Sequence, residues 1–353
     1  MNQLFSERFK SARLLNGLSL QDLADKLNNQ ISRQALHKYE KGEVIPNSEM
    51  LNLLCSVMGV RPDFFFRETT VQLGDIEFRK LRKLPAKEEN KIIEETKDYI
   101  SRYLELEEII GFESEYINPL AGFSTVETFK DVEEAAQKLR LEWSLGTNAI
   151  ANAVELLEDN HIKVIEIEAG DEFDGMQTMV NRKFPLIAIN ISRVKKGDRK
   201  RFTVFHELGH LVLPIKKDLP EKQKEILCHQ FAGSMLFHES SIKKELGIKR
   251  QKLLINELGA LKQEYGISIQ AIVKRAKELD IITNSYYKQF FGYIVQMGWK
   301  IDEPFDYQGN EKSQRFDQLI YRALAEELIS ISKAASLKNM KLTDFKSQSL
   351  NVS

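Results

Sequence analysis

The sequence predicts a mainly α-helical protein with one small β-sheet, an α+β fold. Apolar residues recur at helical spacing along most of the 353 residues. Three short runs with strand character lie close together, at residues 162–167, 175–180 and 185–191. An apolar, helix-like stretch at residues 201–213 follows them directly. A chain of this length is expected to form two or three domains.

Composition limits the function classes that fit the chain. The 51 Lys and Arg residues nearly balance the 52 Asp and Glu residues, which does not favour a generally cationic, nucleic-acid-coating protein. Any DNA binding is therefore expected from a local surface. There is no apolar run of membrane-spanning length and no signal-peptide core. Cys55 and Cys228 lie far apart, so a reduced, cytoplasmic protein is the expectation.

Residues 1–66 carry the spacing of several short helices joined by tight turns. Ser19 and Ser32 can cap the second and third of them. The helices are expected over residues 5–15, 20–27, 33–41 and 48–58. This is the helix-turn-helix pattern, in which one helix enters the major groove of DNA. The alternative is a four-helix module that makes only protein contacts.

The N-terminal segment resembles the Cro/repressor-type (XRE) helix-turn-helix family at residues 18–24, 32–42 and 58–60. The resemblance implies that residues 32–38 present their side chains to DNA. One departure is Leu20, where the family often has Gln; the neighbouring Gln21 is a substitute candidate for that phosphate contact. The expected DNA-binding residues are Gln21, Ser32, Arg33, Gln34, His37 and Lys38.

Residues 67–125 are interpreted as a connector. Residues 71–78 suggest a short strand or an extended segment. Residues 85–110 form one long, charge-rich helix whose apolar stripe is flanked by Lys and Glu. Such a helix is typically a spacer or a dimer element, so a homodimer is one expected assembly.

Residues 126–245 contain the strongest chemical signal in the chain. His206 and His210 are one helical turn apart, so both imidazoles leave the same helix face and can bind one Zn²⁺. Glu207 lies beside this face, where a carboxylate can act as general base. A second helix, expected over residues 220–237, can return Glu225 as the third ligand. Its neighbour His229 is expected to hydrogen-bond a ligand imidazole, or alternatively to bind the metal itself.

Three further features of the chain are assigned no catalytic role. The dense basic run at residues 193–201 is interpreted as a solvated loop and helix start, with a docking surface for an acidic partner as the alternative. The small sheet offers an edge strand for pairing with an extended peptide. Residues 246–353 form a helical C-terminal region, in which two segments after residue 315 again have helix-turn-helix spacing.

Residues 202–213 and 225–232 together resemble the ImmA/IrrE family of zinc metallopeptidases. In that family a Glu-x-x-Ala-Asn-x-Phe-Ala segment supplies the third ligand, which corresponds to Glu225. Cys228 and His229 stand where Ala and Asn are usual. The resemblance implies a zincin-like metallopeptidase domain with a short sheet beside the zinc helix. It also implies cleavage of a specific regulator, typically a helix-turn-helix repressor, in a stress or mobile-element response.

The expected function is therefore that of a zinc-dependent metalloendopeptidase fused to a DNA-binding domain. Two alternatives are a transcriptional regulator or antitoxin-type DNA binder with a structural or metal-sensing zinc site, and the toxin or effector component of a two-gene system. Glu207 favours chemistry, because a purely structural site needs no base beside its ligands.

Overall fold

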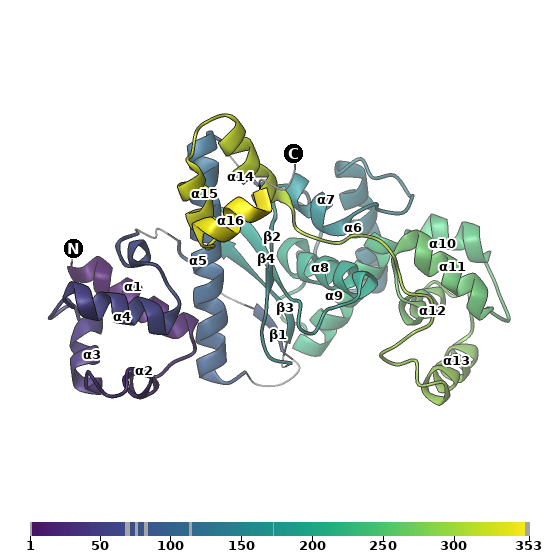
Figure 1. Ribbon diagram of the computed structural model, residues 1–353. Coiled ribbons are helices and arrows are strands. Elements are labelled where there is room, and N and C mark those ends of the chain that lie inside the picture. The colour runs from purple at the N-terminus through teal and green to yellow at the C-terminus, as the bar shows by residue number, and fades with distance from the viewer. Residues whose placement is uncertain are drawn as a thin grey trace. The chain divides into compact units, whose positions relative to one another are not determined.

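The computed structural model describes residues 2–67, 71–74, 77–80, 84–112, 115–171 and 173–349 (Figure 1). The chain divides into two compact units. The first comprises Met1–Leu73, Lys80–Glu113 and Leu319–Ser353, and the second comprises Gly74–Arg79 and Ser114–Gln318. Both are dominated by helices, and the second contains one small sheet, which confirms the predicted α+β class. In the described part of the chain, no helix is long and apolar enough to cross a membrane.

The N-terminal part of the first unit is a bundle of short helices. Its elements are α1 (Asn2–Leu15), α2 (Leu20–Lys26), α3 (Arg33–Glu40), α4 (Ser48–Met58) and the 3₁₀ helix η1 (Pro62–Phe66). The expected caps are confirmed, since Ser19 accepts from the Asp22 amide and Ser32 from the Ala35 amide. The bundle closes around its own core, which includes the fully buried Phe5 and Leu36.

The long helix α5 (Ala86–Ile110) packs within this same unit rather than standing apart. Its buried side chains face α1 and α15 (Ile331–Leu337). Asp98 on α5 forms ion pairs with Arg8 of α1 at 3.3 Å and with Arg102 at 3.1 Å. The apolar stripe expected to act as a spacer or dimer element is therefore covered by the chain's own helices. Figure 1 shows α15 alongside α5, and the tail also contains α14 (Arg315–Ala325) and α16 (Leu342–Ser349).

The second unit contains a four-stranded sheet in the order β1-β3-β4-β2. The strands are β1 (Glu77–Lys80), β2 (Lys163–Ile167), β3 (Phe173–Val180) and β4 (Phe184–Asn190). β3 and β4 are antiparallel, with Gly175 opposite Ile189, whereas β2 runs parallel to β4. The three strands expected before the zinc helix are present, and β1 adds a fourth. Residues 75 and 76, within the extended segment expected at 71–78, lie outside the described residues.

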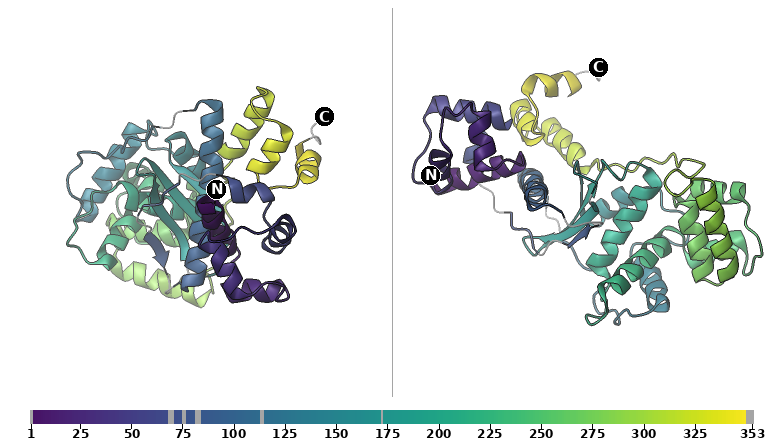
Figure 2. Two further views of the ribbon diagram at one scale, coloured as in Figure 1. Left: turned by 90° about the vertical axis from the view of Figure 1, so that its left-hand side faces the viewer. Right: turned by 90° about the horizontal axis from the view of Figure 1, so that it is seen from below.

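Helix α8 (Gly197–Val212) packs against β3 and β4, and α9 (Glu221–Leu236) packs against α8. Figure 2 shows α8 along one face of the sheet. α6 (Phe129–Glu142) supports α9 from the other side. The remaining helices are α7 (Ala153–Asp159), α10 (Glu239–Leu246), α11 (Ile255–Tyr265), α12 (Ile269–Glu278) and α13 (Asn284–Gln296). α8 thus lies between the sheet and α9.

A partly buried carboxyl group near the end of α7 is expected to make the stability of this unit pH-dependent. Glu158 accepts a hydrogen bond from Ser313 Oγ at 2.6 Å, and burial raises its pKa from 4.5 to about 7. Between these values the folded protein holds a proton that the unfolded chain has lost, so stability falls as pH rises from 4.5 to about 7. Glu158→Gln is expected to stabilise the protein by about 1–2 kcal/mol at pH 8, and less at pH 5. Urea unfolding of both proteins at pH 5 and pH 8 measures the difference in stability. An equal increase in the free energy of unfolding at both pH values would contradict the expected pH dependence.

Candidate metal centre

Three side chains from two adjacent helices converge at the centre of the second unit. His206 and His210 project from the same face of α8, and Glu225 projects from the second turn of α9. His206 is completely buried, His210 is partly buried, and the Glu225 side chain is 41% exposed. The group therefore has a buried side in the core and an accessible side towards solvent.

The donor atoms of these three residues lie close to one another. The Nε2 atoms of His206 and His210 are 3.2 Å apart. The Glu225 carboxylate places Oε2 3.3 Å from His206 Nε2 and Oε1 3.3 Å from His210 Nε2. Ligands about 2.0–2.2 Å from a tetrahedral Zn²⁺ are separated by about 3.3–3.6 Å, so the donor set fits this ion.

The electrostatics of the group favour an ionised Glu225 carboxylate but also a protonated His210, because the pKa of that imidazole is raised, so metal binding there releases a proton. Hydrogen bonds from His206 and His210 hold the pKa of the Glu225 carboxyl well below its usual range, against the effect of burial. Burial alone would lower the pKa of His210, but contacts with Cys228 and Glu225 raise it. The carboxylate is therefore ionised at neutral pH, and a divalent cation would replace the proton shared with the imidazoles.

Gly209 explains how α8 and α9 come close enough to bring the three residues together. A Cβ atom at this position would lie 3.2 Å from a Phe231 ring carbon and 3.3 Å from the Cα of Cys228 on α9. Both neighbours belong to the core and have little room to move. The glycine inside the His-Glu-x-x-His segment is thus needed for helix packing.

Gly209→Ala is expected to push α9 away from α8 and weaken zinc binding by about tenfold, with a loss of about 1–3 kcal/mol of stability from overpacking. Gly233→Ala on α9 is the matched control, because its new Cβ would meet only Arg275 Cδ, at 3.6 Å. That variant should keep its zinc affinity. Zinc titration against a chromophoric chelator and urea unfolding measure the two effects. Equal behaviour of the two variants would contradict the packing argument.

Cys228 and His229, the two positions that depart from the family pattern, both contact the histidine pair. Cys228 is completely buried and hydrogen-bonds with His210. The His229 ring lies against the His206 ring, with 4.4 Å between centroids and 47° between planes. Among the described residues, the group of converging metal donors contains His206, His210 and Glu225 and does not include His229. The His229 ring therefore packs against His206 from outside the converging donor group.

Glu207 is 1% exposed and lies where α8 passes beneath β3. A Cβ atom added to Gly175 of β3 would lie 3.4 Å from Glu207 Cγ and 3.2 Å from Thr203 Cγ2. It would also lie 3.1 Å from the carbonyl oxygen of Ala188 on β4. Gly175 therefore lets the strand approach the helix at the turn that carries the candidate base. This role of Gly175 has no signal in the sequence, since nothing in its neighbours distinguishes it from any other strand glycine.

In the first unit, the residues expected to contact DNA are all exposed. Leu36 and Tyr39 anchor α3 in the core and leave its opposite face accessible. Two of the expected residues also have local partners: the Ser32 hydroxyl caps α3, and the Gln21 amide donates to Asp25. Arg33, Gln34, His37 and Lys38 form the accessible face of α3.

The basic run at residues 193–201 differs from the solvated loop that was expected. Arg201 is completely buried and forms an ion pair with Glu311, which is also buried. Lys200 is 8% exposed and pairs with Glu166 at 2.7 Å. Arg193 and Arg199 both contact Asp174. The partners lie 19 to 110 residues away along the chain, so linear charge density could not show that these cations are paired.

Comparison with known proteins finds a family match in each of two segments of the chain. Residues 9–65 match the helix-turn-helix family, and residues 158–277 match the IrrE N-terminal-like domain. These matches confirm both resemblances seen in the sequence. The chain is also 39% identical over 69 residues to the SPbeta prophage-derived uncharacterized HTH-type transcriptional regulator YonR of Bacillus subtilis (strain 168). That similarity covers 20% of this chain and 62% of the relative's length.

Proposed function

We propose that this chain, in which a helix-turn-helix domain precedes an IrrE N-terminal-like domain, is a zinc-dependent endopeptidase that cleaves a transcriptional regulator. The observation that carries the proposal is the convergence of His206, His210 and Glu225 donor atoms within 4.8 Å of one another, beside a buried glutamate. This donor set, two imidazoles and a carboxylate, is common in hydrolytic zinc sites that keep one open position.

Each residue of the site has a separate role in peptide hydrolysis. His206, His210 and Glu225 would hold Zn²⁺, which when bound lowers the pKa of water and polarises a carbonyl group. Glu207, next to a ligand but pointing off the ligand face, accepts the proton of the attacking water. It then donates this proton to the leaving nitrogen. Its burial beneath β3 excludes bulk water from that carboxylate.

The substrate is proposed to be a helix-turn-helix repressor encoded near this chain's gene. The test incubates the zinc-loaded protein with purified repressors from the same genome and maps fragments by mass spectrometry. One repressor is expected to be cut at a single position, because the candidate centre is partly enclosed by α9 and the sheet. Uniform digestion of every repressor would contradict the proposed specificity.

The helix-turn-helix domain is proposed to bring the enzyme to DNA through the accessible face of α3. Lys38→Ala is expected to weaken binding to a DNA duplex taken from upstream of the gene that encodes this chain. It should also reduce the slope of log affinity against log salt concentration by about 1. Arg33→Ala is expected to cost about 1–3 kcal/mol if the residue reads a base edge. Lys217→Ala, an exposed change in the other unit, is the charge-matched control. An equal loss of DNA affinity in Lys217→Ala would contradict the proposal that α3 contacts DNA.

A second candidate function is a transcriptional regulator in which the metal site senses zinc. The relative named as an HTH-type transcriptional regulator favours it, because the two chains are 39% identical over 69 residues. Operator binding that changes with zinc, together with no cleavage of any repressor, would support this function over the enzyme.

A further inference from the structure

A cleft of about 620 Å³ opens beside the metal centre in the second unit. One end is formed by Phe202, Thr203 and His229. The His229 ring lies 4.4 Å from the His206 ring, and the Phe202 ring lies 5.8 Å from the His229 ring. The other end is formed by the first turn of α8, the start of α12 and residues 300–303. The cleft therefore leads from the candidate catalytic turn towards the N-terminus of α8.

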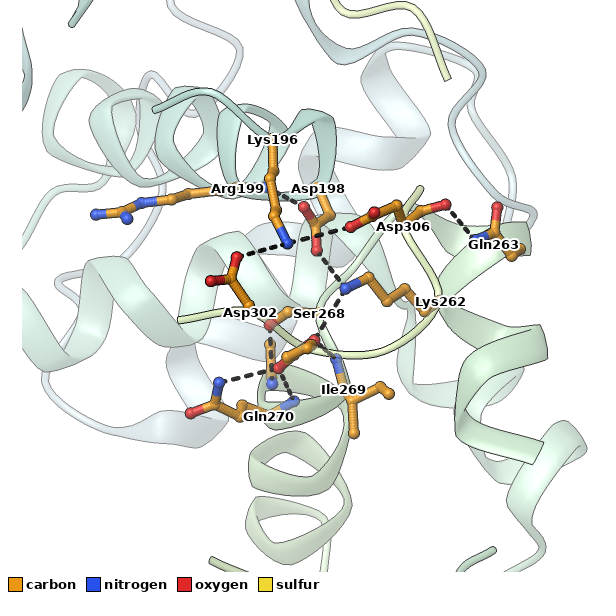
Figure 3. Close-up of polar contacts among 12 residues, drawn as sticks. Lys196, Asp198, Arg199, Lys262, Gln263, Ser268, Ile269, Gln270, Asp302 and Asp306 are labelled. Atoms are coloured by element: carbon orange, nitrogen blue, oxygen red, sulfur yellow. Dashed lines mark hydrogen bonds and ion pairs between the residues drawn. The ribbon is translucent and has the colours of Figure 1, made fainter. Parts of the chain in front are cut away.

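Charged side chains dominate the walls of this cleft. Its seven cations are Arg193, Lys195, Lys196, Arg199, Lys262, Lys274 and Lys300, and its four carboxylates are Asp174, Asp198, Asp302 and Glu303. Lys262 is 1% exposed and lies 3.0 Å from both Asp198 and Glu303 (Figure 3). Lys196 lies 3.1 Å from Asp302 and from Asp306. These two lysines are neutralised by the chain's own acids.

Arg193 and Arg199 differ, because together they share one carboxylate. Arg193 Nε and Arg199 Nη2 lie 2.5 Å and 2.8 Å from the same atom, Asp174 Oδ1. The Asp174 side chain is 4% exposed, whereas those of the two arginines are 27% and 41% exposed. One net positive charge therefore remains on accessible guanidinium groups with fixed positions. Figure 3 shows Arg199 extending away from the lysine pairs.

This arginine pair is close to the candidate catalytic residues. Asp174 directly precedes Gly175, and the backbone of Gly175 lies close to the side chains of Glu207 and Thr203. Arg199 is seven residues before His206 on α8, which corresponds to about 10 Å along the helix. An extended peptide covers this length with about three residues. A side chain held by the arginines would thus lie two to four positions from a bond placed at the metal.

We propose that the cleft binds an acidic segment of the substrate protein, with Arg193 and Arg199 holding a carboxylate two to four residues from the cleaved bond. The inference rests on the proposed peptidase function and names its substrate class. A short acidic peptide needs only the part of the cleft that Arg193 and Arg199 line. Paired guanidinium groups suit carboxylate recognition through parallel hydrogen bonds.

The first arm of the test uses the zinc-loaded protein and a library of peptides from digested cell proteins. Mass spectrometry of the new termini should show Asp and Glu enriched two to four positions from the cleaved bonds. Arg199→Gln, which leaves Arg193 to pair with Asp174, should reduce that enrichment about fivefold. Lys130→Gln removes one exposed cation outside the cleft and should leave it unchanged. Cleavage with no acidic preference overturns the inference while the peptidase function stands.

The second arm measures binding without turnover, so that it is independent of catalysis. Fluorescence anisotropy measures the affinity of the Glu207→Gln protein for two labelled peptides. The peptides differ at two adjacent positions only, where one carries Glu-Glu and the other carries Gln-Gln. The acidic peptide should bind at least about fivefold more tightly, and Arg199→Gln should remove most of that difference, whereas Arg199→Lys should retain part of it. Equal affinity for both peptides overturns the inference. A preserved preference with no cleavage by the unmutated protein refutes the peptidase function alone.

Discussion

Glu207→Gln is expected to reduce repressor cleavage by about 10²–10⁴-fold while zinc content stays near one ion per chain. The amide is nearly isosteric with the carboxylate, so the close approach of Gly175 to this side chain is preserved. An amide cannot accept the proton of the attacking water, and it cannot return a proton to the leaving nitrogen. The loss should therefore occur in kcat, with substrate affinity unchanged.

Single-turnover cleavage with excess enzyme, followed by metal analysis of the same samples, separates these effects. Glu155→Gln, an exposed change on α7, serves as the control and should retain full activity. Full cleavage by Glu207→Gln would exclude this residue as the base. Loss of both cleavage and zinc would instead show that Glu207 supports the metal site.

His206→Ala and Glu225→Ala are each expected to weaken zinc binding by at least about a hundredfold, since even residues that only orient ligands change affinity by 10–100-fold. Zinc held by the folded protein is expected to stabilise the unmutated chain by about 2.7 kcal/mol at a hundredfold excess over the dissociation constant. The variants should lose this stabilisation. Thermal unfolding with and without zinc measures it directly.

His229→Ala provides the comparison that tests the ligand assignment. Its ring lies 4.4 Å from the His206 ring, but it does not belong to the converging donor group. Its removal should lower zinc affinity by about tenfold and leave one zinc bound per chain at saturation. A loss as large as that of Glu225→Ala would make His229 the third ligand and Glu225 a supporting residue.

Local sequence signals predicted the parts of this molecule that depend on local physics. Ser19 and Ser32 cap their helices because a hydroxyl before a helix accepts a backbone N–H, whatever the tertiary context. The i, i+4 spacing of His206 and His210 fixes their shared face in the same way. Glu225 could be proposed because a helix of ordinary length, returning antiparallel, brings its second turn back to the pair.

Features that depend on distant contacts could not be predicted from the sequence. The stripe on α5 shows amphipathicity, but only the structure shows that α1 and α15 cover it. The basic run at 193–201 is a charge cluster in sequence, yet Arg201 is buried on Glu311, 110 residues later. Asp174 gained significance only when the fold placed two arginines on one of its oxygens. In each case the residues that contact each other are far apart in the sequence. The spacing of residues along the chain therefore does not show which of them meet in the fold.

The central claim is that the three converging residues form a zinc centre that hydrolyses peptide bonds. The most direct measurement prepares metal-free protein with a chelator and follows repressor cleavage as zinc is added in fractions of an equivalent. The amount of cleaved repressor is expected to rise linearly with added zinc and to reach its maximum at one zinc per chain. In the same titration, the Glu207→Gln protein should bind zinc but produce no fragments. Cleavage that is already complete in the metal-free protein, or that stays absent at one bound zinc per chain, would contradict the claim.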